Sequence, residues 1–213
     1  MFNFFMTMTI DILSALILLL PCLLLWQIGF NKNTSPVRNT LLVLLAIYIM
    51  AVFHVTGIPD VKSFSPQFNI NLIPSIPLWH LRQYSVHYVL NIFMFIPFGL
   101  LLPCLWKCFS KFRFTLLAGF CFSLGIEILQ LLTFRVTDVD DLITNTLGTV
   151  IGYLLTKLCI HKWSAVQKPK GSQQSTASHS GGIKELLILF GLCFLIWSFI
   201  LPFVNKFLWS VTG

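Results

Sequence analysis

Charged residues are scarce in this sequence. Only 10% of the 213 residues are Asp, Glu, Lys or Arg, and the acidic residues number 7. Soluble domains contain about 25% charged residues, so a water-soluble globular domain is excluded as the fold class. The hydrophobic share of 56% and the mean hydropathy of +0.85 indicate a membrane protein instead.

Metal-binding and disulfide patterns are also absent from the sequence. The 6 cysteines form neither a CxxC pair nor a His/Cys ligand spacing, which excludes the common zinc sites and a disulfide framework. Cys104 and Cys108 share one face of a predicted helix, and we interpret both as buried small apolar residues. We expect neither a metal nor a cofactor.

Six apolar runs are each long enough for a membrane-spanning helix, which needs about 20 residues. They cover residues 10–28, 40–58, 87–106, 114–133, 142–160 and 183–204. The leader before the first run has no Lys or Arg, and no cleavage pattern follows, so we expect a retained helix. The predicted fold class is all-α: a polytopic transmembrane helical bundle of about five helices with one appended C-terminal helix.

The last apolar run is separated from the others by residues 164–182. This stretch is rich in Ser, Gln, Lys and Gly and cannot bury enough apolar surface to order itself. We therefore predict a five-helix membrane unit over residues 1–163, a flexible cytoplasmic linker over 164–182, and an appended transmembrane helix within 183–213.

The net charge of +7 is unevenly distributed. If all six runs cross the membrane, 10 of the 14 Lys and Arg residues fall on one side and 4 on the other. The first side is then cytoplasmic, and both termini face outward. Charges placed in this way suit contact with membrane lipids and not with a nucleic acid. The outer connection, residues 59–86, is rich in Pro and aromatic residues and is expected to be irregular.

An acidic side chain lies inside the fourth apolar run. Placing Glu127 in a spanning helix costs about 3 kcal/mol unless it reaches water or a partner. Gln130 follows at i+3 and Ser123 precedes at i−4, so polar residues share one helical face. Two interpretations stand: an interfacial carboxylate at the helix end, or a site that faces the interior of the bundle.

The connection after this run is strongly polar. Its charged residues are Arg135, Asp138, Asp140 and Asp141. Thr137 or Asp138 can cap the following helix, and acids in its first turn complement the helix dipole. Capping does not account for Arg135, nor for Asn145, which lies one turn after Asp141.

Small residues on two of the runs predict close helix packing. Gly148 and Gly152 are four residues apart, a spacing that lets a neighbouring helix approach closely. In the third run, Gly99 follows Pro97, which removes a backbone hydrogen bond and is expected to kink the helix.

The third run also carries His87 and Asn91 on one face near its outer end. Polar groups from three helices thus fall at one membrane depth, and we predict one outward-facing polar site. Its candidate ligand-binding residues are Asn91, Glu127, Gln130, Arg135, Asp141 and Asn145.

Four segments in a fixed order are similar to a known family. They are NLIP (71–74), NIFMFIPFG (91–99), the E-xx-Q of Glu127 and Gln130, and FRVTDVDDLITNTLG (134–148). Over about residues 52–153 the chain resembles the VanZ-like family of bacterial membrane proteins. The positions that match the family pattern are Asn91, Pro97, Gly99, Glu127, Gln130, Arg135, Asp141, Asn145 and Gly148. Asp138 and Asp140 match it less firmly, and Ser75 departs from the aromatic residue expected after NLIP, which leaves the packing of that loop open.

The resemblance implies a multi-pass protein of the bacterial cell membrane that affects the cell envelope and susceptibility to glycopeptide antibiotics of the teicoplanin type. Two main functions stay open, beside a transporter or flippase and a purely structural network of hydrogen bonds between helices. In the first, the outer site binds a lipid-linked cell-wall precursor, a lipophilic glycopeptide or another anionic ligand, with Arg135 facing phosphate or carboxylate. In the second, an intramembrane enzyme acts on a lipid-linked envelope substrate with Glu127 as the general base.

Overall fold

The structure of the protein is a computed structural model that describes residues 36–58, 70–71, 81–132, 137–164, 179–204 and 206. The first predicted helix, residues 10–28, lies outside the described residues. So do residues 59–69 and 72–80 of the outer connection and residues 165–178 of the predicted linker. The predictions for these segments, and the division of the chain at residues 163 and 182, stay predictions.

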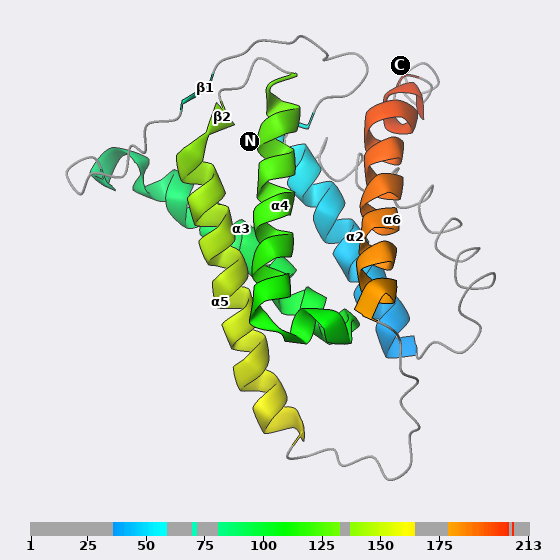
Figure 1. Cartoon of the computed structure of the whole chain (residues 1–213). Coiled ribbons are helices and arrows are strands. Elements are labelled where there is room, and N and C mark those ends of the chain that lie inside the picture. The colour runs from blue at the N-terminus through cyan, green and yellow to red at the C-terminus, as the bar shows by residue number, and fades with distance from the viewer. Residues whose placement is uncertain are drawn as a thin grey trace. The chain divides into compact units, whose positions relative to one another are not determined.

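Helices make up almost all of the described structure (Figure 1). The α-helices are α2 (Pro36–Thr56), α3 (Leu81–Leu105), α4 (Phe112–Gln130), α5 (Val139–Ser164) and α6 (His179–Leu195). The 3-10 helix η1 (Lys107–Ser110) lies between α3 and α4, and the π-helical turn η2 (Ile196–Ile200) continues α6.

Five of these helical stretches are long and apolar enough to cross a membrane. They are Pro36–Thr56, Val86–Leu105, Phe112–Gln130, Val139–Cys159 and Gly181–Val204. Each corresponds to one of the last five apolar runs of the sequence. The all-α fold class of a polytopic membrane protein is confirmed for the described part of the chain.

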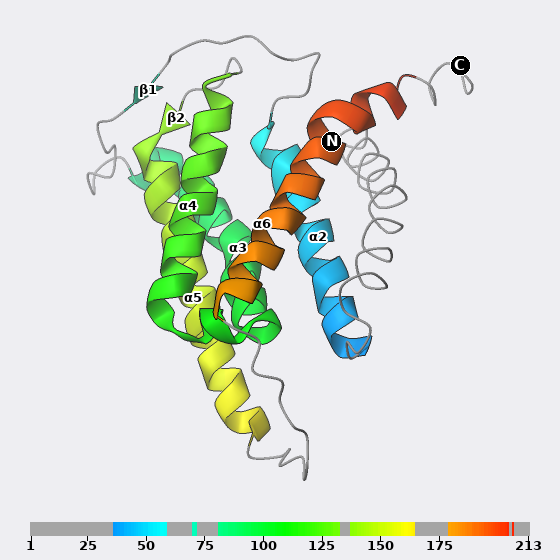
Figure 2. The same ribbon diagram turned by 45° about the vertical axis from the view of Figure 1, so that its right-hand side comes forward.

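The chain divides into two compact units. Unit 1 contains Met1–Asn69, Ile128–Val136 and Leu187–Gly213, and unit 2 contains Ile70–Glu127 and Thr137–Leu186. Helices α4 and α6 therefore each contribute residues to both units. Unit 2 holds α3, most of α4, and α5, and Figures 1 and 2 agree in showing α4 and α5 side by side.

Glycines bring α3 and α5 into backbone contact within unit 2. A Cβ atom added to Gly148 or Gly152 of α5 would overlap the carbonyl oxygens of Ile92 and Ile96 of α3, respectively. A Cβ atom added to Gly99 of α3 would overlap the carbonyl oxygen of Thr149 in the same way. Such small residues allow van der Waals packing between helices where lipid provides no hydrophobic driving force.

Aromatic rings fill the space between α3 and α4. Phe122 of α4 has its ring centroid 5.4 Å from that of Phe95 and 5.0 Å from that of Phe98. All three side chains are buried. Helix α3 stays helical through Pro97 and Pro103, and the kink expected at Pro97 stays a prediction.

A two-residue parallel β pair was not predicted from the sequence. Strand β1 (Ile70–Asn71) pairs with β2 (Thr137–Asp138), and Asn71 is in register with Asp138. The first residue of the NLIP segment is therefore joined to the residue that precedes α5. We call this end of unit 2 the β2 end and the opposite end, at Lys107–Ser110, the η1 end.

At the η1 end, the beginning of α6 packs against Trp106 and η1. The indole Nε1 of Trp106 donates a 2.7 Å hydrogen bond to Oε2 of Glu185. A Cβ atom on Gly182 would lie 2.7 Å from the Sγ atom of Cys108. Burial raises the pKa of the Cys108 thiol, because the charged thiolate is poorly solvated there.

The five described cysteines are free thiols. Cys108 is buried, as expected, but the prediction for Cys104 is wrong because its side chain is exposed. The two residues also do not share a helical face: α3 ends at Leu105, and Cys108 belongs to η1.

Unit 1 joins the end of α2 to η2 and to the last turn of α4. The indole of Trp197 donates to the carbonyl oxygen of Ile58 at 3.2 Å, and its ring lies edge-on to that of Phe53 at 6.3 Å between centroids. Nε2 of Gln130 donates to the carbonyl oxygen of Thr56 at 2.8 Å. Thr56 is the last residue of α2, where backbone carbonyls have no partner within the helix, and Ile58 follows two residues later.

Candidate functional site

The β2 end of unit 2 gathers polar side chains from α3, α4, β2 and α5. The carboxylates are Glu127, Asp138, Asp140 and Asp141, and the neutral members are Tyr88, Asn91, Ser123 and Asn145. We call these eight residues the polar cluster. It forms because α3 and α5 begin, and α4 ends, at the same end of the unit.

Two hydrogen bonds connect α3 to the first turn of α5. Nδ2 of Asn91 donates to Oδ1 of Asp141 at 2.6 Å. The hydroxyl of Tyr88 donates to Oδ2 of Asp140 at 2.9 Å. Tyr88 and Asn91 are three residues apart, so they lie on one face of α3 and meet two successive residues of α5.

Glu127 is inside the unit and not at its surface. Its side chain is 4% exposed, and its Oε2 atom accepts a 3.1 Å hydrogen bond from the backbone N–H of Asp138. This burial favours the second interpretation, a side chain that faces the interior of the bundle. A carboxylate in this position needs donors around it, because an ion without partners is costly in low dielectric.

Asp138 caps helix α5. Its Oδ1 atom accepts a 3.0 Å hydrogen bond from the backbone N–H of Asp140, the second residue of the helix. The capping role predicted for this residue is thereby confirmed. Asp140 is only 1% exposed, so the first turn of α5 buries one of its two acids completely.

Asn145 extends the cluster one turn further along α5. Its Nδ2 atom donates a 2.9 Å hydrogen bond to the hydroxyl of Ser123, and the two side chains are 2% and 0% exposed. Ser123 lies one turn before Glu127 on α4, so the helical faces that carry Glu127 and Asn145 pack against each other.

The polar cluster is acidic. Glu127 interacts electrostatically with Asp138 and Asp141, and Asp141 interacts also with Asp140 and with the exposed His87. The acids accept hydrogen bonds from the Asn91 amide, the Tyr88 phenol and backbone N–H groups, among other contacts. Among the described residues, no group of three or more His, Cys, Asp or Glu is arranged to hold a metal ion.

The six predicted site residues have three different outcomes. Asn91, Glu127, Asp141 and Asn145 belong to the polar cluster of unit 2. Gln130 belongs to unit 1, where its amide is bonded to the end of α2. Arg135 lies outside the described residues.

Tyr88 is the cluster member that reasoning from the sequence missed. His87, four residues before Asn91, is exposed and interacts with Asp141 only electrostatically, whereas the Tyr88 hydroxyl donates a hydrogen bond to Asp140. The signal that could have identified Tyr88 is its i,i+3 spacing to Asn91.

Comparison with known proteins gives one family and one curated relative. The model of the family described as VanZ/LLP1 matches residues 18–160, a longer stretch than the one predicted from the motifs. A protein named Protein VanZ from Enterococcus faecium is 32% identical over 53% of this chain and 70% of its own length. The comparison with solved structures gives no match.

Proposed function

Because this chain belongs to the VanZ/LLP1 family, we propose that it lowers the susceptibility of the cell to glycopeptide antibiotics of the teicoplanin type by binding an envelope ligand. The chain is a multi-pass membrane protein with five described helices of spanning length. The observation that carries the proposal is the polar cluster, where Glu127 is buried among hydrogen-bonding groups of three helices. Burying such groups in a spanning region is costly, which favours a functional reason for them.

The chemistry of the cluster defines the ligand groups it would bind. Carboxylates accept hydrogen bonds, so Glu127 and Asp141 favour hydroxyl, amide or ammonium donors. An anionic group such as phosphate would require a cationic side chain in the site. The sequence predicts that Arg135 is that side chain. Lipid-linked cell-wall precursors and lipophilic glycopeptides combine such donors with anionic groups and an apolar anchor.

The proposed orientation places the polar cluster at the outer leaflet. The η1 end carries Lys107, Lys111 and Arg113, whereas the β2 end carries the acids. The positive-inside rule then assigns the η1 end to the cytoplasm. A ligand of the outer envelope would reach the β2 end without crossing the membrane.

The direct test replaces Glu127 by glutamine. Glu127→Gln keeps an oxygen that can accept the Asp138 N–H bond but removes the ability to ionise or to take up a proton. We expect the teicoplanin tolerance of cells carrying the variant to fall to that of cells without the protein, at unchanged membrane abundance. The matched control is Glu185→Gln at the η1 end, which should keep the tolerance. An unchanged tolerance in Glu127→Gln would overturn the proposal, and an equal loss of abundance would assign a structural role to Glu127.

The ligand itself is identified by binding to purified protein. Teicoplanin and a lipid-linked cell-wall precursor are each titrated against wild type and Arg135→Ala in neutral detergent. Removal of a charge-assisted contact costs about 1.5–3 kcal/mol, which corresponds to a tenfold or greater loss of affinity. Binding that is unaffected by Arg135→Ala would exclude the anionic contact while leaving the role of Glu127 open.

A second candidate function is catalysis by an intramembrane enzyme. The observation that favours it is that Glu127 is 4% exposed and held by the Asp138 N–H, the kind of fixed, dehydrated carboxylate that serves as a general base. An enzyme would convert the lipid-linked precursor into a product, and Glu127→Gln would stop turnover while binding persisted. A binding protein would release the precursor unchanged.

A further inference from the structure

Opposite charges occupy opposite ends of unit 2. The acids of the polar cluster lie at the β2 end, whereas basic side chains lie at the η1 end. Four of them, Lys107, Lys111, Arg113 and Lys157, form a group that we call the basic rim. Along α5, Asp141 and Lys157 are 16 residues apart, which is about 24 Å at 1.5 Å per residue.

The basic rim is exposed and not neutralised by the described protein. All four side chains are exposed, and none of them makes an ion pair with a described residue. Glu185, near the beginning of α6, accepts a hydrogen bond from the indole of Trp106. Four exposed positive charges at one end of a helical unit attract an anionic partner.

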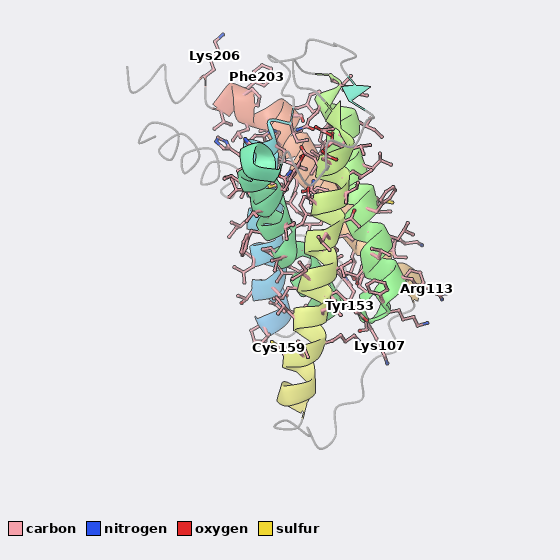
Figure 3. All side chains as sticks on the ribbon, turned by 90° about the vertical axis from the view of Figure 1, so that its left-hand side faces the viewer. Lys107, Arg113, Tyr153, Cys159, Phe203 and Lys206 are labelled. Carbon is pink, nitrogen blue, oxygen red and sulfur yellow. The ribbon has the colours of Figure 1, made fainter. Side chains whose placement is uncertain are left out.

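Aromatic rings accompany two of these charges. Nζ of Lys157 lies 5.3 Å from the ring centroid of Tyr153, and the guanidinium of Arg113 lies 4.9 Å from that of Phe114. The Tyr153 ring also packs against Phe112 at 5.4 Å, and its hydroxyl donates to the carbonyl oxygen of Ser110 at 2.8 Å. Figure 3 shows Tyr153, Lys107 and Arg113 near one another, with the two basic side chains directed away from the helices.

The rim is located at the boundary of the membrane-spanning stretches. One span ends at Leu105 and the next begins at Phe112, so Lys107 and Lys111 lie between them. Lys157 is two residues before the end of the span that closes at Cys159. Aromatic residues with basic neighbours at this level are typical of the zone of lipid headgroups.

We propose that the basic rim binds the phosphate of an anionic phospholipid headgroup. The guanidinium of Arg113 offers two parallel N–H donors to phosphate oxygens, and Lys111 and Lys157 supply compact positive charges at the same end of the unit. The exposed ring of Phe112 would contact the glycerol and upper acyl region of the same lipid, and the buried ring of Tyr153 packs behind it. This proposal is independent of the ligand proposed for the polar cluster.

The test compares phosphatidylglycerol with phosphatidylcholine. The full chain is purified in neutral detergent at low salt, each lipid is titrated, and bound lipid is counted by native mass spectrometry. Wild type should prefer phosphatidylglycerol, and the triple variant Lys111→Gln/Arg113→Gln/Lys157→Gln should bind it about 100-fold more weakly, at about fivefold per charge. The matched control, Lys206→Gln, removes an exposed charge from unit 1 and should keep the preference.

Other outcomes would overturn the proposal. They are equal binding of the two lipids by wild type, an unchanged preference in the triple variant, and an equal loss in Lys206→Gln. Displacement of the lipid by inorganic phosphate would assign the rim to a soluble anion instead. If the triple variant does not fold, wild type is titrated with salt: a preference that persists when charges are screened would equally contradict the proposal.

Discussion

The side-chain amide of Asn91 donates a 2.6 Å hydrogen bond to Oδ1 of Asp141, and this bond joins α3 to the first turn of α5. It lies at the same end of unit 2 as the bond from Tyr88 to Asp140. The glycine contacts between α3 and α5 begin close by, because Gly148 packs on the carbonyl of Ile92, the residue after Asn91. Polar bonding and backbone packing therefore support the same helix pair.

A double-mutant cycle measures the strength of this bond. We expect Asn91→Ala and Asp141→Ala each to lower the free energy of unfolding, and the double variant to lose less than the sum of the two. Hydrogen bonds between membrane helices contribute about 0.6 kcal/mol on average and up to about 1.7, so the coupling should fall in that range. Unfolding of purified protein in mixed micelles gives the values, and strictly additive losses would mean that the two side chains do not interact.

The glycine contact predicts a severe effect of a single methyl group. Gly148→Ala would drive a Cβ atom into the carbonyl oxygen of Ile92, so α3 and α5 must separate. Overpacking of this kind costs about 1–3 kcal/mol. Gly125→Ala on α4 is the matched control, because nothing lies within 4 Å of its added Cβ atom. Thermal unfolding should separate the two variants, and equal melting temperatures would contradict the close backbone contact between α3 and α5.

The buried thiol of Cys108 should react at higher pH than an ordinary cysteine. Maleimide reacts with the thiolate, and burial raises the pKa of this thiol, so less thiolate is present at a given pH. In a variant that retains Cys108 alone, the labelling rate of the folded protein should rise at higher pH than that of the same protein denatured in detergent. Superimposable pH profiles would show that the site is open to solvent.

The orientation of the protein can be tested with single cysteines in a cysteine-free background. Thr137→Cys at the β2 end should be labelled by a membrane-impermeant reagent on intact cells. Lys107→Cys at the η1 end should be labelled only after permeabilisation. The reversed pattern would place the polar cluster in the cytoplasm and remove the basis for an outer-envelope ligand.

Much of the fold could be predicted from the sequence because membrane helices follow simple rules. Apolar runs of about 20 residues mark the spans, which is why the five described spans agree with the predicted ones. The helix cap at Asp138 was predictable for the same local reason, since a cap depends on residues adjacent in sequence.

Partners distant in sequence could not be predicted in this way. Gln130 lies three residues after Glu127 on the same helical face, which predicts that the two share a site. Its amide instead bonds to the carbonyl oxygen of Thr56, 74 residues away. The pairing of Asn71 with Asp138 is likewise a contact between distant segments. The prediction that Cys104 and Cys108 share a helical face failed because the sequence does not reveal that α3 ends at Leu105 and that Cys108 belongs to η1.

The bond from the Asp138 N–H to Glu127 spans 11 residues of sequence and has an evolutionary consequence. A side chain on one helix can reach the cap of the next only if the segment between them has the right length. Insertions and deletions between these two positions should therefore be rare among relatives, whereas residues 165–178, which lie outside the family match, should tolerate them. An alignment of relatives in which the segment between the acid and the cap varies freely in length would argue against a shared geometry.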